Sequence, residues 1–393
     1  MELKTRIAAV IAVSVCGMCL FSGCSSEELE GKIEEPTEKT AEYATAAGNP
    51  IWSSVNGKKI GDEDGYDAAI TEDGESAVQF EHFPDSYKPQ KSEYNFYFTY
   101  KMVHPWWDAV SLGMESAVEK YKDLGVNISF DYVAPNQVSS LDQRKKLLKA
   151  AQEDYDVIGV DVDDKKVITP VINELMESGK KVMTFASSDS NKEDGCKRIA
   201  YVGNTHNYRD GADLTEALCE KLGRKGKIVL LIGTQSSPCY EDRARAAREI
   251  INKYPDMEIV DSAYDEDNED IAYEYTMGFI KKYPDISGII CCDMSGPVGA
   301  AKAVIEEGLQ KKITIVGMDH DKQALEFLRD GNIYCLGVQD CFSMGFDTIQ
   351  TAIKIADGLM PGGEYRETTD EKTTIIYKDD AKYMLRVLYG EID

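Results

Sequence analysis

The sequence has far fewer basic residues than acidic ones, and it carries no recognisable catalytic motif. Its 393 residues include 44 Lys and Arg against 70 Asp and Glu, a formal net charge of −26. Nucleic-acid partners are held by clustered Lys and Arg, so this balance argues against one. GxSxG, Walker and GxGxxG motifs are missing, as is a nucleophile paired with a general base. We therefore expect no enzyme activity and no cofactor.

Zinc-type cysteine spacing is also missing beyond the N-terminal segment. Three of the ten cysteines lie within the first 24 residues, and the other seven are Cys196, Cys219, Cys239, Cys291, Cys292, Cys335 and Cys341. No CxxC or Cys/His spacing among the seven suggests a metal. An odd number cannot pair completely within one chain, so we expect small buried hydrophobic side chains. A disulfide between Cys335 and Cys341 is the alternative.

The first 23 residues have the pattern of a secretory signal. Lys4 and Arg6 precede an apolar run over residues 7–20, which is too short for an ordinary membrane span. Small residues then lead to Cys24, and this arrangement resembles the bacterial lipobox, in which the cysteine is acylated. Phe21 stands where that pattern has an aliphatic residue; secretion without an anchor is the alternative. We expect an extracytoplasmic protein that Cys24 anchors to the cell membrane.

Two further segments precede the body. Residues 24–49 are rich in Glu, Thr and Ala and lack an apolar stripe, which is typical of a disordered tether. Residues 50–91 form an N-terminal extension that combines aromatic residues with many acidic ones. Its packing on the body is left open by the sequence.

From about residue 92, short β-rich runs alternate with amphipathic helical stretches. The expected strands are 94–102, 127–133, 157–160, 181–185, 228–232, 258–263, 286–291 and 313–316. The expected helices are 107–124, 141–152, 170–178, 208–222, 243–253, 271–282, 298–307 and 321–328. This alternation predicts βαβ units and parallel sheets. So many units exceed one sheet of usual size, and the fold class is therefore α/β with two doubly wound parallel-sheet lobes.

Ligands of such sheets bind beyond the carboxyl ends of the strands. The residues that follow the expected strands are mostly polar and include two tryptophans: His104, Trp106, Trp107, Asp161, Ser187, Ser188, Asp189, residues 234–237, Asp293, Asp319 and Gln339. This composition suits ligand binding better than catalysis.

Five short motifs occur in the order found in a known family. They are His104-Pro105-Trp106-Trp107, residues 241–245 with Arg243, Cys292-Asp293-Met294, Val316-Gly317-Met318-Asp319, and Val338-Gln339 followed by Met344-Gly345. Over about residues 94–378 the chain resembles the ribose/galactose-type periplasmic sugar-binding proteins, the substrate-binding lipoproteins of ABC sugar transporters. The family commonly has Asn-Pro-Phe-Phe at the first motif and Val-Gly-Phe-Asp at the fourth.

The resemblance implies two lobes joined by a three-strand hinge, with crossovers near 203–204, 339–340 and 369–374. Lobe 1 would comprise residues 92–204 and 340–371, and lobe 2 residues 205–339 and 372–393. Closure over a small polar ligand would present it to a membrane ABC permease with its ATPase. We expect a monomer.

The resemblance also assigns the ligand contacts. Trp106 and Trp107 would stack on a sugar ring, while Arg243, Asp293, Asp319 and Gln339 would hold hydroxyls. His104 and Asp189 complete the set, although neither reproduces the family's local sequence. If the three aspartates line the cleft, Arg243 alone offsets them. We expect a monosaccharide or a related polyol or amino sugar, and the excess of carboxylates favours a cationic amino sugar or a hydroxyl-dense polyol.

Three other functions share the expected fold or some of the expected site residues. A lipoprotein that presents a signal molecule, such as an autoinducer, to a membrane sensor would have the same fold. An extracytoplasmic glycosidase needs two carboxylates that flank the scissile bond, for which Asp293 and Asp319 are candidates by composition alone. A lac-repressor-type regulator would share the core, but it needs a helix-turn-helix that the sequence lacks.

Overall fold

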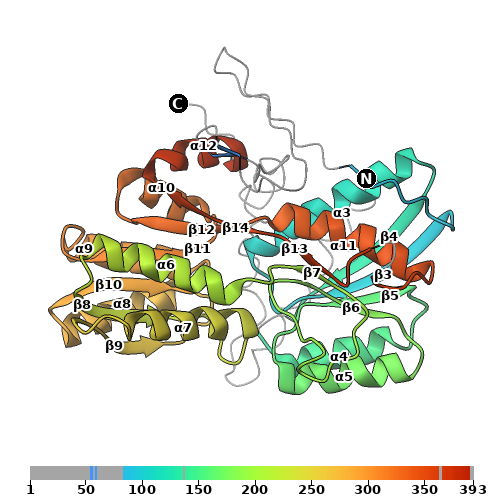
Figure 1. The fold of residues 1–393 in the computed structure, drawn as a ribbon, viewed down its shortest axis with the longest axis horizontal. Helices are drawn as coiled ribbons and strands as arrows, with labels where there is room; N and C mark the ends of the chain where they lie inside the picture. The colour runs from blue at the N-terminus through green and yellow to red at the C-terminus, as the bar shows by residue number, and fades with distance from the viewer. Residues whose placement is uncertain (1–53, 56–57, 60–82, 136–137, 363–364, 390–393) are drawn as a thin grey trace, which may run out of the picture. The chain divides into compact units, whose positions relative to one another are not determined.

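The computed structural model describes residues 54–55, 58–59, 83–135, 138–362 and 365–389 (Figure 1). The signal segment, the tether and Cys24 lie outside the described residues. The first described elements are a short antiparallel pair, β1 (Ser54–Val55) and β2 (Lys58–Lys59).

The first sheet has six strands, all parallel, in the order β13-β7-β6-β5-β3-β4. Every residue of β5 and β6 is buried, as expected for strands covered on both faces. The strands are β3 (Glu93–Thr99), β4 (Asn127–Val133), β5 (Val157–Val160), β6 (Val182–Ala186), β7 (Tyr201–Gly203) and β13 (Thr368–Asp370).

The second sheet also has six strands, in the order β14-β12-β11-β10-β8-β9. Its strands are parallel except for β14, which runs antiparallel to β12 at the sheet edge. They are β8 (Gly226–Leu231), β9 (Met257–Ala263), β10 (Ile286–Cys291), β11 (Thr314–Met318), β12 (Cys335–Gln339) and β14 (Thr373–Tyr377).

Helices cover both faces of each sheet (Figure 1). We call the first sheet with its helices the first lobe; these are α3 (Pro105–Asp123), α4 (Ser140–Ala150), α5 (Lys165–Glu177) and α11 (Cys341–Ala356). The second lobe has α6 (Asn207–Lys221), α7 (Pro238–Ile251), α8 (Glu269–Lys282), α9 (Gly296–Glu306), α10 (Lys322–Asp330) and α12 (Lys378–Tyr389). The prediction of two doubly wound α/β lobes is confirmed.

Two helix starts, those of α5 and α7, differ from their predictions by five residues. The sequence suggested a helix from Pro170, but α5 begins at Lys165, because the Asp164 carboxylate accepts a hydrogen bond from the Lys166 N–H and caps the helix there. Pro170 then lies in the second turn.

Helices α3 and α11 pack with their backbones in contact. A Cβ at Gly113 would lie 2.0 Å from the Phe342 carbonyl oxygen, and one at Gly345 would lie 1.9 Å from the Val110 oxygen. Both positions therefore require glycine. The contact fixes α11, which comes from the C-terminal third of the chain, against the first lobe.

The chain passes three times between the lobes: from β7 to α6, from β12 to α11 and from β13 to β14. Each lobe is therefore assembled from separate stretches of sequence. This arrangement brings the carboxyl ends of both sets of parallel strands to the region of the crossovers.

The described end of the N-terminal extension contacts the first lobe. The Asp85 carboxylate forms an ion pair with Lys354 of α11, and the Asp85 N–H donates to Gln350 Oε1 at 2.7 Å. The Tyr87 hydroxyl and the Gln90 N–H both donate to Asp357 at 2.9 Å. Residues 83–91 thus pack on the body.

All seven cysteines beyond the N-terminal segment are buried and free. This confirms the prediction of small buried side chains, and the alternative disulfide between Cys335 and Cys341 is wrong. Each of these two thiols lies in the interior, where burial raises its pKa above the usual value for cysteine.

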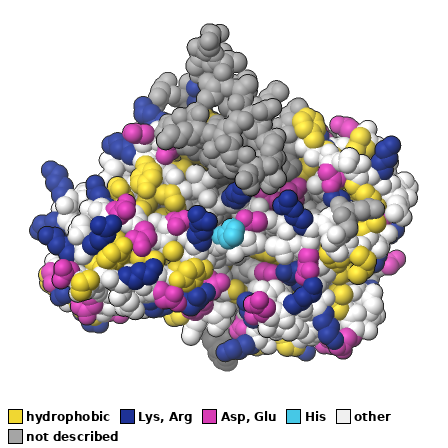
Figure 2. Space-filling view, viewed as in Figure 1, with side chains coloured by type: hydrophobic (Ala, Val, Ile, Leu, Met, Phe, Trp, Pro, Cys, Tyr) yellow, Lys and Arg dark blue, Asp and Glu magenta, His cyan; other side chains and the backbone are white. Residues whose placement is uncertain are grey.

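The surface carries both signs of charge. On the face in Figure 2, basic and acidic side chains are interspersed over the described residues, without a continuous basic patch. In the described part of the chain, no helix is both long enough and apolar enough to span a bilayer.

Candidate ligand-binding site

Buried polar atoms without a hydrogen-bond partner gather at the carboxyl ends of the strands in both lobes. Because buried polar atoms are almost always hydrogen-bonded, such a cluster marks a place where a ligand or water molecules supply the partners. In the first lobe they are Thr99 Oγ1, Asp161 Oδ2, Asp163 Oδ1 and Ser188 Oγ; in the second they are Thr234 Oγ1, Arg243 Nε, Asp265 Oδ2 and Asp293 Oδ2.

Asp161 organises the first-lobe part of this set. It follows β5, is fully buried, and its Oδ1 accepts from the Ser187 N–H (3.1 Å), the Ser187 hydroxyl (2.9 Å) and the Ser188 N–H (2.8 Å). Burial raises its pKa, and the nearby Lys101 ammonium opposes that rise. Its Oδ2 has no hydrogen bond and lies 3.8 Å from Lys101 Nζ.

Lys101 is a site residue that the sequence reasoning missed. It lies two positions beyond β3 and is 2% exposed. Its ammonium donates to Ser237 Oγ at 3.1 Å and to Cys239 Sγ at 3.3 Å, both in the second lobe, and lies 4.5 Å from the Tyr240 ring centre. A buried lysine from one lobe therefore reaches into the other.

Three aspartates line the second-lobe side. Asp265 accepts from the Gly233 N–H at 2.6 Å, Asp293 from the Gly296 N–H at 2.9 Å, and Asp267 from the Tyr240 hydroxyl at 2.6 Å. Burial and the neighbouring carboxylates raise the pKa of Asp293 well above its usual value, and burial raises that of Asp265 to about 6.

Asp267 behaves differently from its two neighbours. Burial by itself raises its pKa, but His104, the Tyr240 hydroxyl and Lys101 together lower it below the usual value. Asp267 thus stays ionised, whereas its surroundings disfavour the charged forms of Asp265 and Asp293 by raising the pKa of each.

Two predicted site residues make direct contacts between the lobes. His104 caps α3 and places its Nε2 3.1 Å from Ser295 Oγ and 3.8 Å from Asp267 Oδ1. The indole N–H of Trp106 donates to Asp319 Oδ1 at 3.0 Å. With the Lys101 contacts, these bonds hold the strand ends of the two lobes against each other.

Asp319 links this interface to the hinge. It has a left-handed backbone conformation, with φ of 70°, and its Oδ1 also accepts from Gln339 Nε2 at 2.7 Å. Burial raises its pKa to about 6, against the opposing effect of Arg243. A non-glycine residue held at positive φ is uncommon and tends to occur at functional sites.

The three crossovers meet at one amide. Asn204 Nδ2 lies 2.6 Å from Asp210 Oδ2, 3.0 Å from Gln339 Oε1 and 3.1 Å from Thr373 Oγ1. The Thr373 hydroxyl donates to the same Asp210 oxygen at 2.8 Å. Asn204, Gln339 and Thr373 each belong to a different crossover. These four residues, which we call the hinge cluster, thus join the three connections between the lobes.

Arg243 is 1% exposed and lies in the second turn of α7, because the helix begins at Pro238 and not at residue 243. Its terminal nitrogens donate to the Cys292 carbonyl at 2.8 Å and to Asn207 Oδ1 at 2.7 Å, while Nε has no partner. The guanidinium is therefore held by the second lobe with one donor left over.

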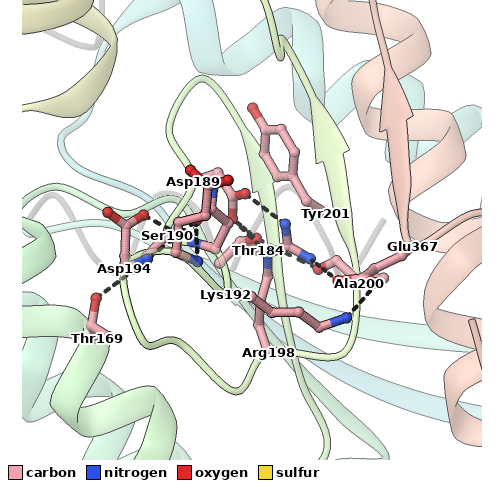
Figure 3. Close-up of polar contacts among 12 residues, drawn as sticks. Thr169, Thr184, Asp189, Ser190, Lys192, Asp194, Arg198, Ala200, Tyr201 and Glu367 are labelled. Atoms are coloured by element: carbon pink, nitrogen blue, oxygen red, sulfur yellow. Dashed lines mark hydrogen bonds and ion pairs between the residues drawn. The ribbon is translucent and has the colours of Figure 1, made fainter.

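The structure does not bring Trp107 and Asp189 into the direct contacts between lobes. Trp107 is 3% exposed and packs against Tyr100, with ring centres 4.8 Å apart. Asp189 forms a bidentate ion pair with Arg198, at 2.7 and 2.6 Å, and accepts from the Thr184 hydroxyl (Figure 3). Ligand contact by either residue stays a prediction.

The fold and this site define a two-lobed ligand-binding protein. Within the described ranges, no group of three or more His, Cys, Asp or Glu side chains is arranged to hold a metal ion. What the site offers is a buried set of carboxylates, hydroxyls and one arginine donor, which can satisfy a ligand with many hydroxyl groups.

Comparison with known proteins agrees with this class. A family model described as "Periplasmic binding protein domain" matches residues 96–360. The chain belongs to this family, and the predicted resemblance to the ribose/galactose type is confirmed.

Curated relatives include the xylitol-binding protein of Mycolicibacterium smegmatis, 25% identical over 42% of this chain and 45% of the relative. The D-allose-binding periplasmic protein of Escherichia coli is 22% identical over 62% of this chain and 78% of the relative. The match spans about half the length of the xylitol-binding protein and of a D-apiose import binding protein from Actinobacillus succinogenes.

Among solved structures, the glucose-galactose binding protein GanP from Geobacillus stearothermophilus is 25% identical, with a TM-score of 0.67, over 74% of this chain and 99% of that chain. A solute binding protein from Bacillus halodurans with bound myo-inositol, at 16% identity and a TM-score of 0.67 over 75% of this chain and 98% of that chain, shares the fold. Both similarities show that this chain shares the two-lobed fold of solute-binding proteins.

Proposed function

We propose that this protein is a solute-binding lipoprotein that captures a monosaccharide or related polyol between its lobes and delivers it to an ABC importer. The buried, unpartnered polar atoms at the strand ends of both lobes carry the proposal. They lie on both sides of the contacts between lobes, so a ligand that satisfied them would touch both lobes. Relatives that bind xylitol and D-allose support a hydroxyl-rich ligand.

Closure is proposed to occur by bending at the three crossovers, with residues 92–204 and 340–371 moving against residues 205–339 and 372–393. Hinge closure of this kind excludes water from the ligand's hydrogen bonds. The cluster around Asn204 supports the proposal, because its hydrogen bonds join all three crossovers. His104, Trp106, Asp293, Asp319, Gln339 and Arg243 are the proposed contacts nearest the interface.

A thermal-shift screen of the full chain carrying Cys24→Ser, against pentoses, hexoses, polyols and amino sugars, tests the binding function. A ligand at 100 times its dissociation constant stabilises the folded state by roughly 2.7 kcal/mol. We expect a clear rise in melting temperature with one or a few compounds, and loss of that rise in Arg243→Ala. A well-folded sample that responds to no sugar or polyol would contradict the proposal.

The anchor and the importer need separate tests. Lipidation predicts that the wild-type chain is recovered with membranes and that Cys24→Ser releases it. Delivery predicts that a strain without this protein loses uptake of the identified ligand. Binding with unimpaired uptake would instead favour presentation of a signal molecule to a membrane sensor.

A further inference from the structure

Lys101 occupies the position in which a cationic ligand would be best held. Its ammonium lies between a first-lobe carboxylate, Asp161, at 3.8 Å and two second-lobe acceptors, Ser237 Oγ at 3.1 Å and Cys239 Sγ at 3.3 Å. The face of the Tyr240 ring lies 4.5 Å away. Carboxylates, hydroxyls and aromatic faces are the partners that bind an ammonium group, and here the chain's own lysine uses all three.

The charge of this lysine is maintained by its surroundings. Burial by itself lowers the pKa of Lys101, but Cys239, Asp161, Asp163 and Asp267 together raise it above the usual value. The side chain is 3% exposed, so water screens the ammonium very little. A second cation placed beside these residues would therefore meet a like charge that water hardly screens.

We propose that Lys101 is a specificity-determining residue: its ammonium makes the cleft select neutral hydroxyl-rich ligands and reject their cationic amino analogues. This inference rests on the proposed sugar-binding function. The sequence left open a cationic amino sugar or a hydroxyl-dense polyol, because Arg243 alone offset the aspartates. Lys101 is a second cation at the same interface, and it pairs with the carboxylate that an amino sugar would need.

The polar atoms that remain suit hydroxyl groups. Thr99 Oγ1 and Ser188 Oγ can donate or accept, and Asp163 Oδ1 accepts. Thr99 and Asp163 belong to the same strand ends as Lys101 and Asp161, and Ser188 lies beside them because its N–H donates to Asp161. A sugar hydroxyl can both donate and accept, whereas an ammonium group only donates.

Isothermal titration of the wild-type protein at pH 7 against matched pairs tests the proposal: D-galactose and D-galactosamine, D-glucose and D-glucosamine, and myo-inositol and an amino-deoxy-inositol. We expect the parent of each bound pair to bind at least about tenfold more tightly than the amine, a difference of about 1.4 kcal/mol. Lys101→Met should abolish or reverse this preference, because Asp161 then lacks its cation. Lys101→Arg, which keeps the charge, should retain it.

Lys166→Met is the matched control, since it removes a lysine charge from an exposed position on α5 of the same lobe. It should leave the selectivity unchanged. Circular dichroism checks the fold of each variant. If Lys101→Met does not fold, the wild-type pairs and Lys101→Gln still decide the question.

Equal binding of a sugar and its amine by the wild-type protein would overturn the role of Lys101 and leave sugar binding intact. Unchanged selectivity in folded Lys101→Met would do the same. If the folded wild-type protein binds no neutral member of the panel, the proposed sugar function fails, and this inference fails with it.

Discussion

Replacing Asn204 by Ala should destabilise the protein out of proportion to the few atoms removed. The side chain is 2% exposed and joins the three crossovers. The substitution removes a 2.6 Å hydrogen bond to Asp210, a 3.0 Å bond to Gln339 and the 2.7 Å bond by which Asn204 Oδ1 accepts from the His206 N–H.

The size of the effect follows from these three bonds. A hydrogen bond to a carboxylate contributes about 1.5–3 kcal/mol, a neutral one about 1 kcal/mol, and buried groups left without a partner add to the cost. We expect a loss of about 4 kcal/mol in the free energy of unfolding. For a protein of this size that corresponds to roughly 5 °C in melting temperature.

Differential scanning calorimetry of Asn204→Ala beside Asn173→Ala measures the difference. Asn173 also makes two backbone hydrogen bonds, donating to the Gly195 oxygen at 2.9 Å and accepting from the Lys197 N–H at 2.8 Å, but it lies at the surface of α5. Water replaces such bonds, so its loss should be below about 1 kcal/mol. A shift for Asn204→Ala no larger than that for Asn173→Ala would refute the reasoning.

Three further outcomes are expected. Because burial raises the pKa of Asp319 to about 6, the folded state binds the Asp319 proton more tightly than the unfolded state does. The contribution of this proton to stability is complete below about pH 4 and is lost as the pH rises through 6. In denaturant titrations, Asp319→Asn should therefore reduce the fall in the free energy of unfolding between about pH 4.5 and 7. Gly113→Ala should lower the free energy of unfolding by roughly 3 kcal/mol or more, since its Cβ would lie 2.0 Å from the Phe342 oxygen. Gly278→Ala is the control: this position on α8 faces open space, so the variant should raise the free energy of unfolding by up to about 1 kcal/mol in the same experiment. The Cys239 thiol, buried between the lobes, should be alkylated by iodoacetamide several times more slowly once a sugar is bound, as followed by peptide mass spectrometry; an unchanged rate would contradict closure over the ligand.

The periodic part of the fold could be predicted because parallel strands covered on both faces are continuous apolar runs. Strands such as β5 and β6 are of this kind, and amphipathic helices separate them. Other features depended on partners distant in sequence. The antiparallel pairing of β14 with β12 and the close approach of Gly113 and Gly345 are tertiary contacts without a local signal.

The candidate site was partly predictable for a geometric reason. Residues that follow parallel strands meet at one sheet edge, so His104, Asp293 and Asp319 could be grouped without a structure. Lys101 escaped notice because it lay inside a segment expected to be strand, and β3 in fact ends at Thr99. The pairing of Asp189 with Arg198 depends on the course of the loop after β6, which no periodicity reveals.

The return of the chain to the first lobe has a consequence for the order of its synthesis. When residue 339 has been made, β3 to β7 are complete, but α11 and β13 do not yet exist. Many of the apolar side chains of the core beneath α3, including Phe346, Ile349 and Ile353, belong to α11. The N-terminal half therefore carries exposed apolar surface until α11 and β13 have been made, and long-range contacts of this kind form slowly. The residues after 340 thus set the moment at which the N-terminal half becomes resistant to proteases.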